Sequence, residues 1–262
     1  YIAYLRQFIC KSLPLPFSFF AWHRSLELQN LYRLLLILIF TLSFPSYAAW
    51  EVKDLIRSKQ DTIELTYNGS VFSIATKQLR EINFIFQSIC ARAEQSASLW
   101  IESGLAPNAS ARGLGSNRIT INFGMISMIG DNQAEWAALI GHEVAHLKLE
   151  HSKAGLKRKV PLELARGLIN EKVENRTLST LLGLTTQAID SHYSQKQEND
   201  SDYLGAIWAV EAGYSAWGAA GLHSKLLAIK PGNNYPEFLR SHPSSEKRVE
   251  RLGTLAERLD AQ

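Results

Sequence analysis

The sequence predicts an α+β domain, mostly helical, with a small β-sheet beside one central helix. Short apolar segments separated by Gly- and Asn-rich turns occupy residues 50–73 and 98–121, which is typical of strands. Residues 77–96 and most of the chain after residue 131 instead follow the periodicity of amphipathic helices. The roughly 214 residues from 49 to 262 suit one domain of ordinary size, so we expect a single domain there.

The elements of this domain can be placed in order along the chain. Residues 50–73 read as two short strands or a hairpin, with Tyr67-Asn68-Gly69-Ser70 as the turn. Residues 77–96 read as an amphipathic helix, and residues 98–121 read as strands joined by turns. A central helix follows, and Asp131 can cap its N-terminus. Breaks in the helical part that follows are marked by Pro161, Pro231, Pro236 and Pro243.

Residues 1–48 read as an N-terminal extension that ends in an export signal. An apolar run at residues 34–44 follows Arg33, and small residues then lead up to Ala48. This is the pattern of a secretory signal peptide, which we expect to be cleaved near Ala48 or Ala49. The run is short for a membrane-spanning helix, which needs about 20 apolar residues, but an uncleaved anchor stays open. Export would place the domain in the periplasm of a bacterial envelope.

Charge and cysteine content argue against two kinds of site. Residues 1–48 contain four of the 28 basic residues and one of the 25 acidic ones, so 24 of each remain in residues 49–262. Balanced charge gives no support for nucleic-acid binding, and no nucleic-acid partner is expected. Cys90 is the one cysteine of the predicted domain, which excludes an internal disulfide and a cysteine-rich zinc site.

The motif Gly141-His-Glu-Val-Ala-His146 gives the strongest indication of chemistry. On a helix, His142 and His146 lie one turn apart on the same face, so both imidazoles can bind a single Zn²⁺. Glu143 can then reach a metal-bound water and act as its general base. The alternative is a helix with two ordinary histidines and a solvated glutamate. The apolar residues around the motif favour the metal site, because a buried carboxylate and buried histidines need a partner.

A catalytic zinc also needs a third protein ligand. Glu198 and Asp202 lie one turn apart on a helix predicted downstream of the motif. Glu198 can ligate the metal, and Asp202 can accept a hydrogen bond from the distal nitrogen of a ligand histidine. A solvated acidic helix face is the alternative for this pair.

Several stretches together resemble the HtpX and CAAX-prenyl-protease type of zinc metallopeptidase, specifically its small soluble periplasmic branch. That family pairs HExxH with a downstream ExxAD, and this chain has Glu198-Asn-Asp-Ser-Asp202, with Ser201 in place of the alanine. The resemblance covers roughly residues 75–255, with its motifs in the family's order. The further matches are Asn108-Ala-Ser-Ala111, the segment at 118–122, Ala212-Gly-Tyr214, and Ser241-His-Pro-Ser244 with Glu246 and Arg248.

The resemblance implies a gluzincin-type domain that holds one Zn²⁺ per chain through His142, His146 and Glu198. It implies an endopeptidase in which Glu143 takes a proton from the zinc-bound water and later delivers it to the leaving amine. An extended substrate is expected to pair with the edge of a strand formed by Arg118, Ile119, Thr120, Ile121 and Asn122.

Other residues of the C-terminal half have open roles. The resemblance places His242 near the metal, where it would polarise the substrate carbonyl or fill the fourth metal position in a closed form. An ordinary loop histidine is the alternative for His242. Arg248 would hydrogen-bond an oxyanion or hold the C-terminal helix through an ion pair, and we favour the ion pair. We expect His151 near the C-terminus of the HExxH helix, where the helix dipole favours it, and His223 at the surface or in packing.

By resemblance, the expected substrates are unfolded or misassembled envelope proteins, which implies a role in protein quality control. A chaperone-like assembly factor with little proteolysis is the alternative function, and a structural zinc without chemistry is a weaker one. The oligomeric state and a peripheral contact with the membrane stay open. Residues 162–184 are apolar enough to pack over the site or to form a partner surface, and the sequence does not decide between the two.

Overall fold

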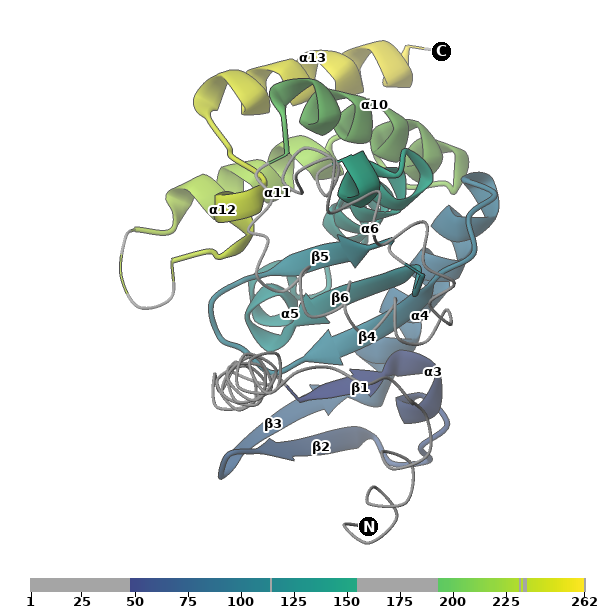
Figure 1. Cartoon of the computed structure of the whole chain (residues 1–262), viewed down its shortest axis with the longest axis vertical. Coiled ribbons are helices and arrows are strands. Elements are labelled where there is room, and N and C mark those ends of the chain that lie inside the picture. Colours follow the sequence, from purple (N-terminus) through teal and green to yellow (C-terminus); the bar gives the residue numbers. More distant parts are fainter. Residues whose placement is uncertain (1–47, 114, 155–192, 231, 233–234, 262) are drawn as a thin grey trace, which may run out of the picture. The chain divides into compact units, whose positions relative to one another are not determined.

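The computed structural model describes residues 48–113, 115–154, 193–230, 232 and 235–261 (Figure 1). The predicted signal peptide and the apolar stretch at 162–184 lie outside these residues. Within them the chain forms the predicted α+β domain, with a small sheet and a larger set of helices.

The described strands form one four-stranded sheet and one hairpin. The sheet contains β1 (Ala49–Glu51), β4 (Ser98–Glu102), β6 (Arg118–Asn122) and β5 (Ala109–Arg112), in that spatial order. β4 and β6 run parallel, whereas β1–β4 and β5–β6 are antiparallel pairs. The separate hairpin consists of β2 (Thr62–Tyr67) and β3 (Ser70–Ala75). Its turn residues Asn68 and Gly69 have φ values of 48° and 76°, so the predicted hairpin is confirmed.

The position of β6 in the sheet corrects one prediction. β6 lies between β4 and β5 and pairs with both, so that Thr120 stands opposite Trp100 on one side and Ser110 on the other. An interior strand has its backbone N–H and C=O groups already paired, so Arg118–Asn122 cannot hold a substrate by edge pairing. The edge strand on this side of the sheet is β5. Residue patterns reveal a strand but not its neighbours, which is why the prediction was wrong.

The central HExxH helix is α6 (Gln133–Lys148). Its N-cap is Asn132, whose Oδ1 accepts a hydrogen bond from the backbone N–H of Glu135 at 3.1 Å. The predicted cap, Asp131, instead accepts a hydrogen bond from Nε2 of Gln78 at 3.4 Å. The other described helices are α3 (Val52–Leu55), α4 (Thr76–Arg92), α5 (Phe123–Ile129), α10 (Gln195–Glu211), α11 (Gly218–Ala228), α12 (Phe238–Ser241) and α13 (Glu246–Asp260).

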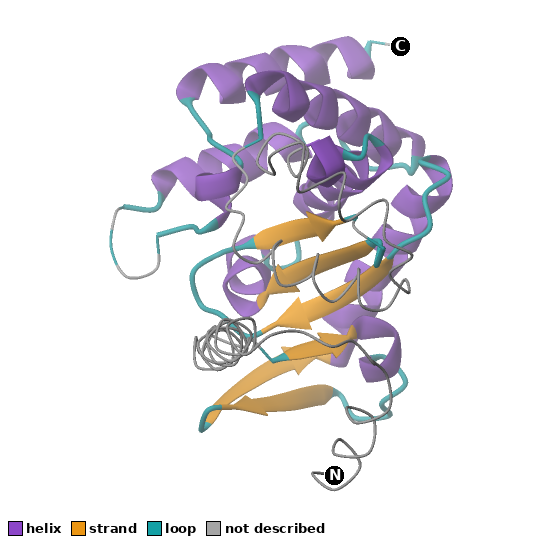
Figure 2. Ribbon diagram, viewed as in Figure 1, coloured by secondary structure: helices purple, strands orange, loops and turns teal. Residues whose placement is uncertain are grey.

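Most of these helices gather beside the β5 edge of the sheet (Figure 2), and α6 contacts β5 directly. In the part of the chain that the structure describes, no helix is both long and apolar enough to cross a membrane.

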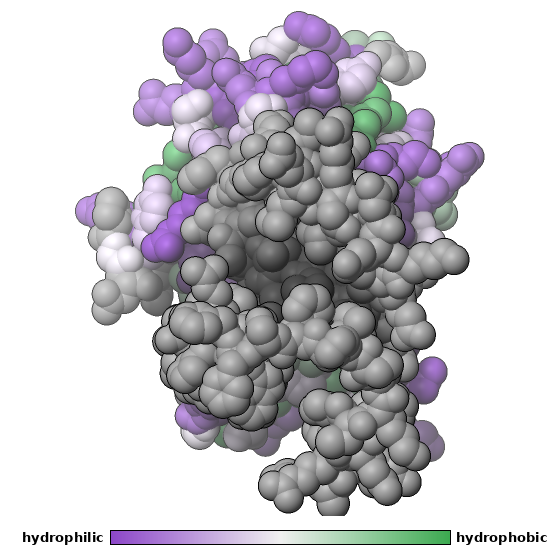
Figure 3. All heavy atoms as spheres, in the orientation of Figure 1, coloured by the Kyte–Doolittle hydropathy of each residue, from purple (hydrophilic) through white to green (hydrophobic). Residues whose placement is uncertain are grey.

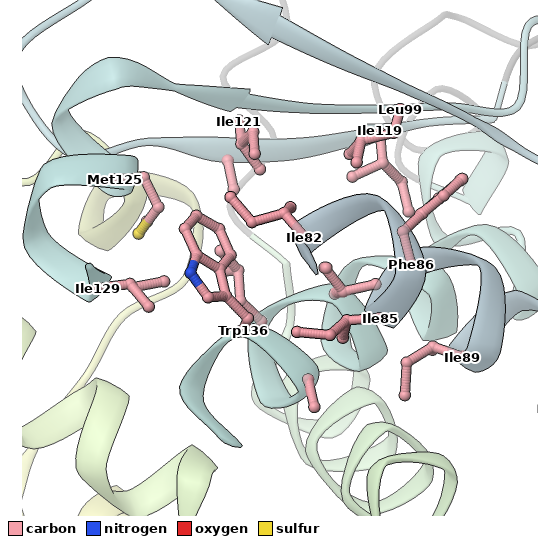
Figure 4. Close-up of a cluster of buried hydrophobic side chains, with 14 of the residues drawn as sticks. Ile82, Ile85, Phe86, Ile89, Leu99, Ile119, Ile121, Met125, Ile129 and Trp136 are labelled. Atoms are coloured by element: carbon pink, nitrogen blue, oxygen red, sulfur yellow. The ribbon is translucent and has the colours of Figure 1, made fainter. Parts of the chain in front are cut away.

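The hydrophobic core lies between the sheet, α4 and the first half of α6 (Figure 4). Trp136 of α6 is 2% exposed, and its Nε1 donates a hydrogen bond to the backbone oxygen of Gly130 at 2.8 Å. The core thereby fixes α6 beside the sheet. The side chains around Trp136 come from α4 (Ile82, Ile85, Phe86, Ile89), from the strands (Leu99, Ile119, Ile121) and from α5 (Met125, Ile129).

Two glycines allow α6 and α10 to approach backbone to backbone. A Cβ atom added at Gly141 would lie 2.6 Å from the backbone oxygen of Gly205. One added at Gly205 would lie 2.7 Å from the backbone carbon of Gly141. Any side chain at either position would therefore push the two helices apart. Gly141 directly precedes His142, so this contact sets the distance between the HExxH motif and the acidic residues of α10.

Candidate metal centre

The HExxH motif presents its two histidines on one face of α6, as the spacing predicted. The Nε2 atoms of His142 and His146 lie 3.0 Å apart. Both side chains are buried, and Glu143 between them is fully buried as well. The three residues therefore lie inside the domain, where charged groups need compensation.

Helix α10 brings Glu198 to the same point. Its N-terminus carries a capping box, in which Ser194 Oγ accepts from the backbone N–H of Gln197 and Gln197 Oε1 accepts from that of Ser194. Glu198 is the residue after Gln197, and it is 4% exposed. Its Oε1 lies 3.3 Å from Nε2 of His146, and its Oε2 lies 3.6 Å from Nε2 of His142.

His242 completes the cluster from the segment after α12. Its Nδ1 lies 3.0 Å from Nε2 of His142 and 3.0 Å from Oε1 of Glu198. The ring of Phe238 stacks on it at 4.3 Å between centroids, and its backbone N–H donates to the Phe238 carbonyl at 2.9 Å. His142, His146, Glu198 and His242 thus offer one ligand atom each, all within 4.8 Å of one another.

The donor set fits a single divalent cation. In a tetrahedral site with bonds of about 2.0–2.1 Å, two ligand atoms lie roughly 3.3 Å apart. Four contacts in the cluster, at 3.0 to 3.3 Å, are close to that value, and the remaining ligand atoms lie within 4.8 Å of one another. Among the described residues, neither carboxylate oxygen of Glu143 has a hydrogen-bond partner, although Oε1 lies 3.5 Å from Nε2 of His242. A fully buried carboxylate in that position fits a group that handles protons beside a metal.

Asp202 and Arg248 surround the ligands with a charged network. Nδ1 of His142 lies 3.0 Å from Oδ1 of Asp202, the partner that the sequence suggested for a ligand histidine. Arg248 donates to both oxygens of Asp202, at 2.6 and 3.0 Å, and its Nη1 lies 2.7 Å from Oε2 of Glu198. The ion pair favoured for Arg248 is therefore present, and it joins two acidic residues of α10 to α13.

Helix α13 presents Arg248 from its first turn. Ser245 caps the helix by accepting the backbone N–H of Arg248 at 3.2 Å. Arg248, Leu252 and Ala256 are its buried residues, four positions apart, which is the spacing of one helix face. The surface over α13 is hydrophilic (Figure 3). Amphipathic patterning thus turns one basic side chain inward while its neighbours remain in water.

Electrostatics hold the two acidic residues of α10 in their charged forms. Burial opposes this, but the charges of His142 and His242 and hydrogen bonds from His146 and His242 lower the pKa of Glu198 well below its usual range. The pKa of Asp202 is lowered in the same way. Burial raises it, but a hydrogen bond from His142 and the charges of His142 and Arg248 lower it by more. Both groups are therefore carboxylates that can accept a metal or a hydrogen bond.

The residues of the HExxH motif respond differently to burial. Burial raises the pKa of Glu143, and the nearby charges of His242 and His142 only partly oppose it. Burial also lowers the pKa of His146 well below its ordinary value, which favours the neutral imidazole that metals bind. Glu143 therefore binds a proton more readily than an ordinary glutamate, unlike Glu198 and Asp202.

Two contacts of His146 were not anticipated. Nδ1 of His151 lies 2.9 Å from Nδ1 of His146, so His151 belongs to the cluster and not merely to the helix end. The ring of Tyr193 packs on His146 with centroids 3.9 Å apart. A third histidine five residues after HExxH is the signal that could have revealed the first contact. His223 is a packing residue, as expected, and its Nδ1 lies 2.9 Å from Oγ of Ser244.

Comparison with known proteins agrees with this geometry. Metalloprotease LoiP of Escherichia coli (strain K12) is 27% identical over 151 residues, which is 56% of this chain and 59% of that protein. Metalloprotease YcaL of the same organism is 26% identical over 151 residues, 56% of this chain and 58% of that protein. Mitochondrial metalloendopeptidase OMA1 of Arabidopsis thaliana is 27% identical over 146 residues, 56% of this chain and 29% of that protein.

The chain therefore spans less than two thirds of the length of these relatives. The sequence profile of peptidase family M48 matches residues 76–256, which include α4, the whole metal cluster and most of α13. This chain belongs to peptidase family M48.

Proposed function

We propose that the chain is a zinc-dependent endopeptidase of the cell envelope that hydrolyses unfolded or misassembled envelope proteins. The observation that carries the catalytic part is the convergence of four ligand atoms beside Glu143, whose carboxylate has no hydrogen-bond partner in the described part of the chain. Membership of a metallopeptidase family supports it. The envelope location and the role in quality control rest on the signal-peptide pattern of residues 1–48 and on the resemblance of the motifs.

Zinc is the cation that this donor set suits best. Imidazole nitrogens with one carboxylate are common ligands of catalytic Zn²⁺, and we assign that role to His142, His146 and Glu198. A bound Zn²⁺ supplies Lewis-acid chemistry, because it lowers the pKa of water and polarises a carbonyl group. Asp202 is placed to orient His142, since its Oδ1 lies 3.0 Å from Nδ1 of that ring, and Arg248 holds both carboxylates of α10 in place.

Glu143 acts as the general base. Its carboxylate takes the proton from the attacking water and later gives that proton to the leaving amine of the cleaved peptide. The raised pKa of Glu143 suits both steps, since a base whose pKa lies closer to neutrality accepts and returns a proton more readily.

The edge strand β5 is the place for an extended substrate. Antiparallel pairing with β6 uses the backbone groups on one side of β5 and leaves its other side at the edge of the sheet. The backbone oxygen of Ala111 accepts a hydrogen bond from Oγ of Ser152 at 3.3 Å, so a substrate strand that pairs there must replace this contact. A peptide lying along β5 would add a strand beside α6 and reach the metal cluster.

His242 accounts for a closed resting form. Its Nδ1 lies 3.0 Å from Nε2 of His142 and from Oε1 of Glu198, so it would hold a bound metal at the position that a catalytic site keeps open for water. Substrate cleavage then requires the segment around His242 to move away. We assign His242 this inhibitory role, with carbonyl polarisation as the alternative.

The test compares wild type with Glu143→Gln. Both proteins are assayed for zinc content and for casein hydrolysis, with circular dichroism as the check on folding. We expect about one zinc per chain in both. We expect Glu143→Gln to lose on the order of 10²–10⁴ in rate, because an amide cannot accept the proton. Wild-type protein without zinc, or a Glu143→Gln variant with undiminished activity, contradicts the proposal. A Glu143→Gln variant that has lost casein hydrolysis but retains full physiological activity would favour the chaperone-like alternative.

A further inference from the structure

We propose that His151 is a positioning residue for the metal ligand His146: it accepts the Nδ1–H of His146 and so keeps Nε2 of His146 available for the metal. This inference rests on the proposed function only in requiring a metal at Nε2 of His146. It assigns a role to a residue that the HExxH motif does not include.

The chain returns to the site directly after α6. The helix ends at Lys148, and Glu150 adopts a left-handed φ of 53° before the chain continues in a short helical turn. This turn brings His151 back beside the helix face that carries His146. The side chain of His151 is buried, with only 6% of the residue exposed. Its Nδ1 lies 2.9 Å from Nδ1 of His146, and the two rings meet nearly edge to face, with an interplanar angle of 72°.

The position of the protons follows from the ligand role. Nε2 of His146 points at the cluster, 3.0 Å from His142 and 3.3 Å from Glu198. A metal at Nε2 needs the lone pair of that nitrogen, so the ring proton must be on Nδ1. The 2.9 Å contact is then a hydrogen bond from His146 to Nδ1 of His151, and His151 carries its own proton on Nε2.

The two ligand histidines therefore have different supports. Nδ1 of His142 faces the carboxylate of Asp202 at 3.0 Å, whereas Nδ1 of His146 faces a neutral imidazole. A carboxylate, a backbone carbonyl or a water is the usual partner of a ligand histidine. A further carboxylate at this point would add negative charge to a site that already buries Glu143, Glu198 and Asp202. A neutral acceptor orients His146 without that cost.

Ser201 contributes a weaker contact with His151. It occupies the position where the resembling family usually has alanine, and it is fully buried. Its Oγ lies 3.4 Å from Nδ1 of His151. A ring nitrogen has one lone pair, so it cannot accept strongly from both His146 and Ser201. We therefore expect Ser201 to confine the ring of His151 and to affect the metal little.

The experiment measures metal affinity in four proteins: wild type, His151→Phe, His151→Asn and Ser201→Ala. Phenylalanine keeps a ring but has no acceptor, whereas the Asn carbonyl oxygen can stand near the place of Nδ1. The readouts are the Zn²⁺ dissociation constant, from competition with a chelator, and the absorption spectrum of Co²⁺-loaded protein. We expect His151→Phe to weaken Zn²⁺ binding by about 10- to 100-fold and to change the Co²⁺ spectrum. His151→Asn and Ser201→Ala should stay within a few-fold of wild type.

Two results would overturn the inference. One is wild-type affinity with an unchanged Co²⁺ spectrum in His151→Phe. The other is equal weakening in His151→Phe and His151→Asn, because a role that depends only on packing would not distinguish the two. Casein hydrolysis is recorded separately. Zinc binding that depends on His151 without any hydrolysis by wild type would contradict the proposed function and support the role of His151.

Discussion

Helix α6 divides the domain into two regions that are stabilised in opposite ways. Towards α4 and the sheet it buries apolar side chains such as Phe86 and Ile121 around Trp136. Towards α10 and α13 it buries charged and polar side chains, among them Glu198 and Arg248, at 5% exposure or less. Each contact in the apolar region stabilises the folded domain. Each buried charge in the polar region destabilises the folded domain unless it has its partner. The residues proposed to act in catalysis therefore lie in the region that depends on complete pairing.

The largest expected effect tests the apolar region. Phe86→Ala should lower the free energy of unfolding by about 3–5 kcal/mol, because it leaves a cavity at a side chain that is 1% exposed. Chemical denaturation measures the loss. Phe84→Ala on the same helix is the matched control, since Phe84 is 68% exposed and should change stability by less than about 0.5 kcal/mol. Zinc affinity of the folded Phe86 variant should stay close to wild type, and a large loss would mean that the two regions are not independent.

His242→Ala tests whether the polar region is closed at rest. If His242 fills the fourth metal position, removing its imidazole frees that position, and basal casein hydrolysis should rise. If His242 instead polarises the substrate carbonyl, kcat should fall by roughly 10²–10³-fold. We expect the rise, since Nδ1 of His242 lies 3.0 Å from two other ligand atoms. An unchanged rate would return His242 to the role of an ordinary buried histidine.

Gly205→Ala tests how closely the two helices of the site must approach. The added Cβ would lie 2.7 Å from backbone atoms of Gly141 and His142, so α6 and α10 must separate. We expect a loss of about 1–3 kcal/mol in stability and weaker zinc binding. Gly253→Ala on α13 is the control, because its Cβ meets only Trp217 at 3.5 Å and alanine is the better helix former by about 1 kcal/mol. Wild-type zinc affinity in Gly205→Ala would show that the helix spacing is not critical.

The smallest effect is expected at the rim of the polar region. The side chain of Arg251 is 39% exposed, and its Nη2 lies 2.7 Å from Oδ2 of Asp202. Arg251→Ala should cost about 0.2–1 kcal/mol, because water and salt screen such a pair. Arg248→Ala, which leaves Asp202 and Glu198 buried without their partner, should cost about 3–5 kcal/mol. Equal losses in the two variants, measured by thermal unfolding, would contradict this distinction between rim and interior.

The parts of the site that sequence reasoning could find are those set by local geometry. His142, Glu143 and His146 follow from one turn of helix, and Glu198 and Asp202 from one turn of another. The prediction that these two helices meet came from the family resemblance alone, because helical periodicity does not show which helices are in contact. The contact of His151 with His146 was not predicted, because the spacing of the histidines alone does not reveal the left-handed φ of Glu150 that turns the chain back.

The fold shows the same limit. The hairpin at Asn68 and Gly69 was predictable, since a turn is specified by its own residues. The place of β6 between β4 and β5 was not, because strand order depends on partners that are distant in the sequence. The prediction of β6 as the substrate strand failed for this reason, and β5 takes its place in the proposal.

The distance along the chain between the ligands has a consequence for when activity can begin. His142 and His242 meet in space but are 100 residues apart in sequence, and Arg248 follows later still. Until this last segment has been made and has docked, Glu198 and Asp202 lack their arginine and the cluster lacks His242. On the proposed function, the order of synthesis delays completion of the metal centre. The centre is assembled last, on a core that the earlier residues have already built. A growing chain would then carry His142, His146 and Glu198 before Arg248 arrives to hold Glu198 in place, so its ligands are not yet fixed while its own segments are still unfolded.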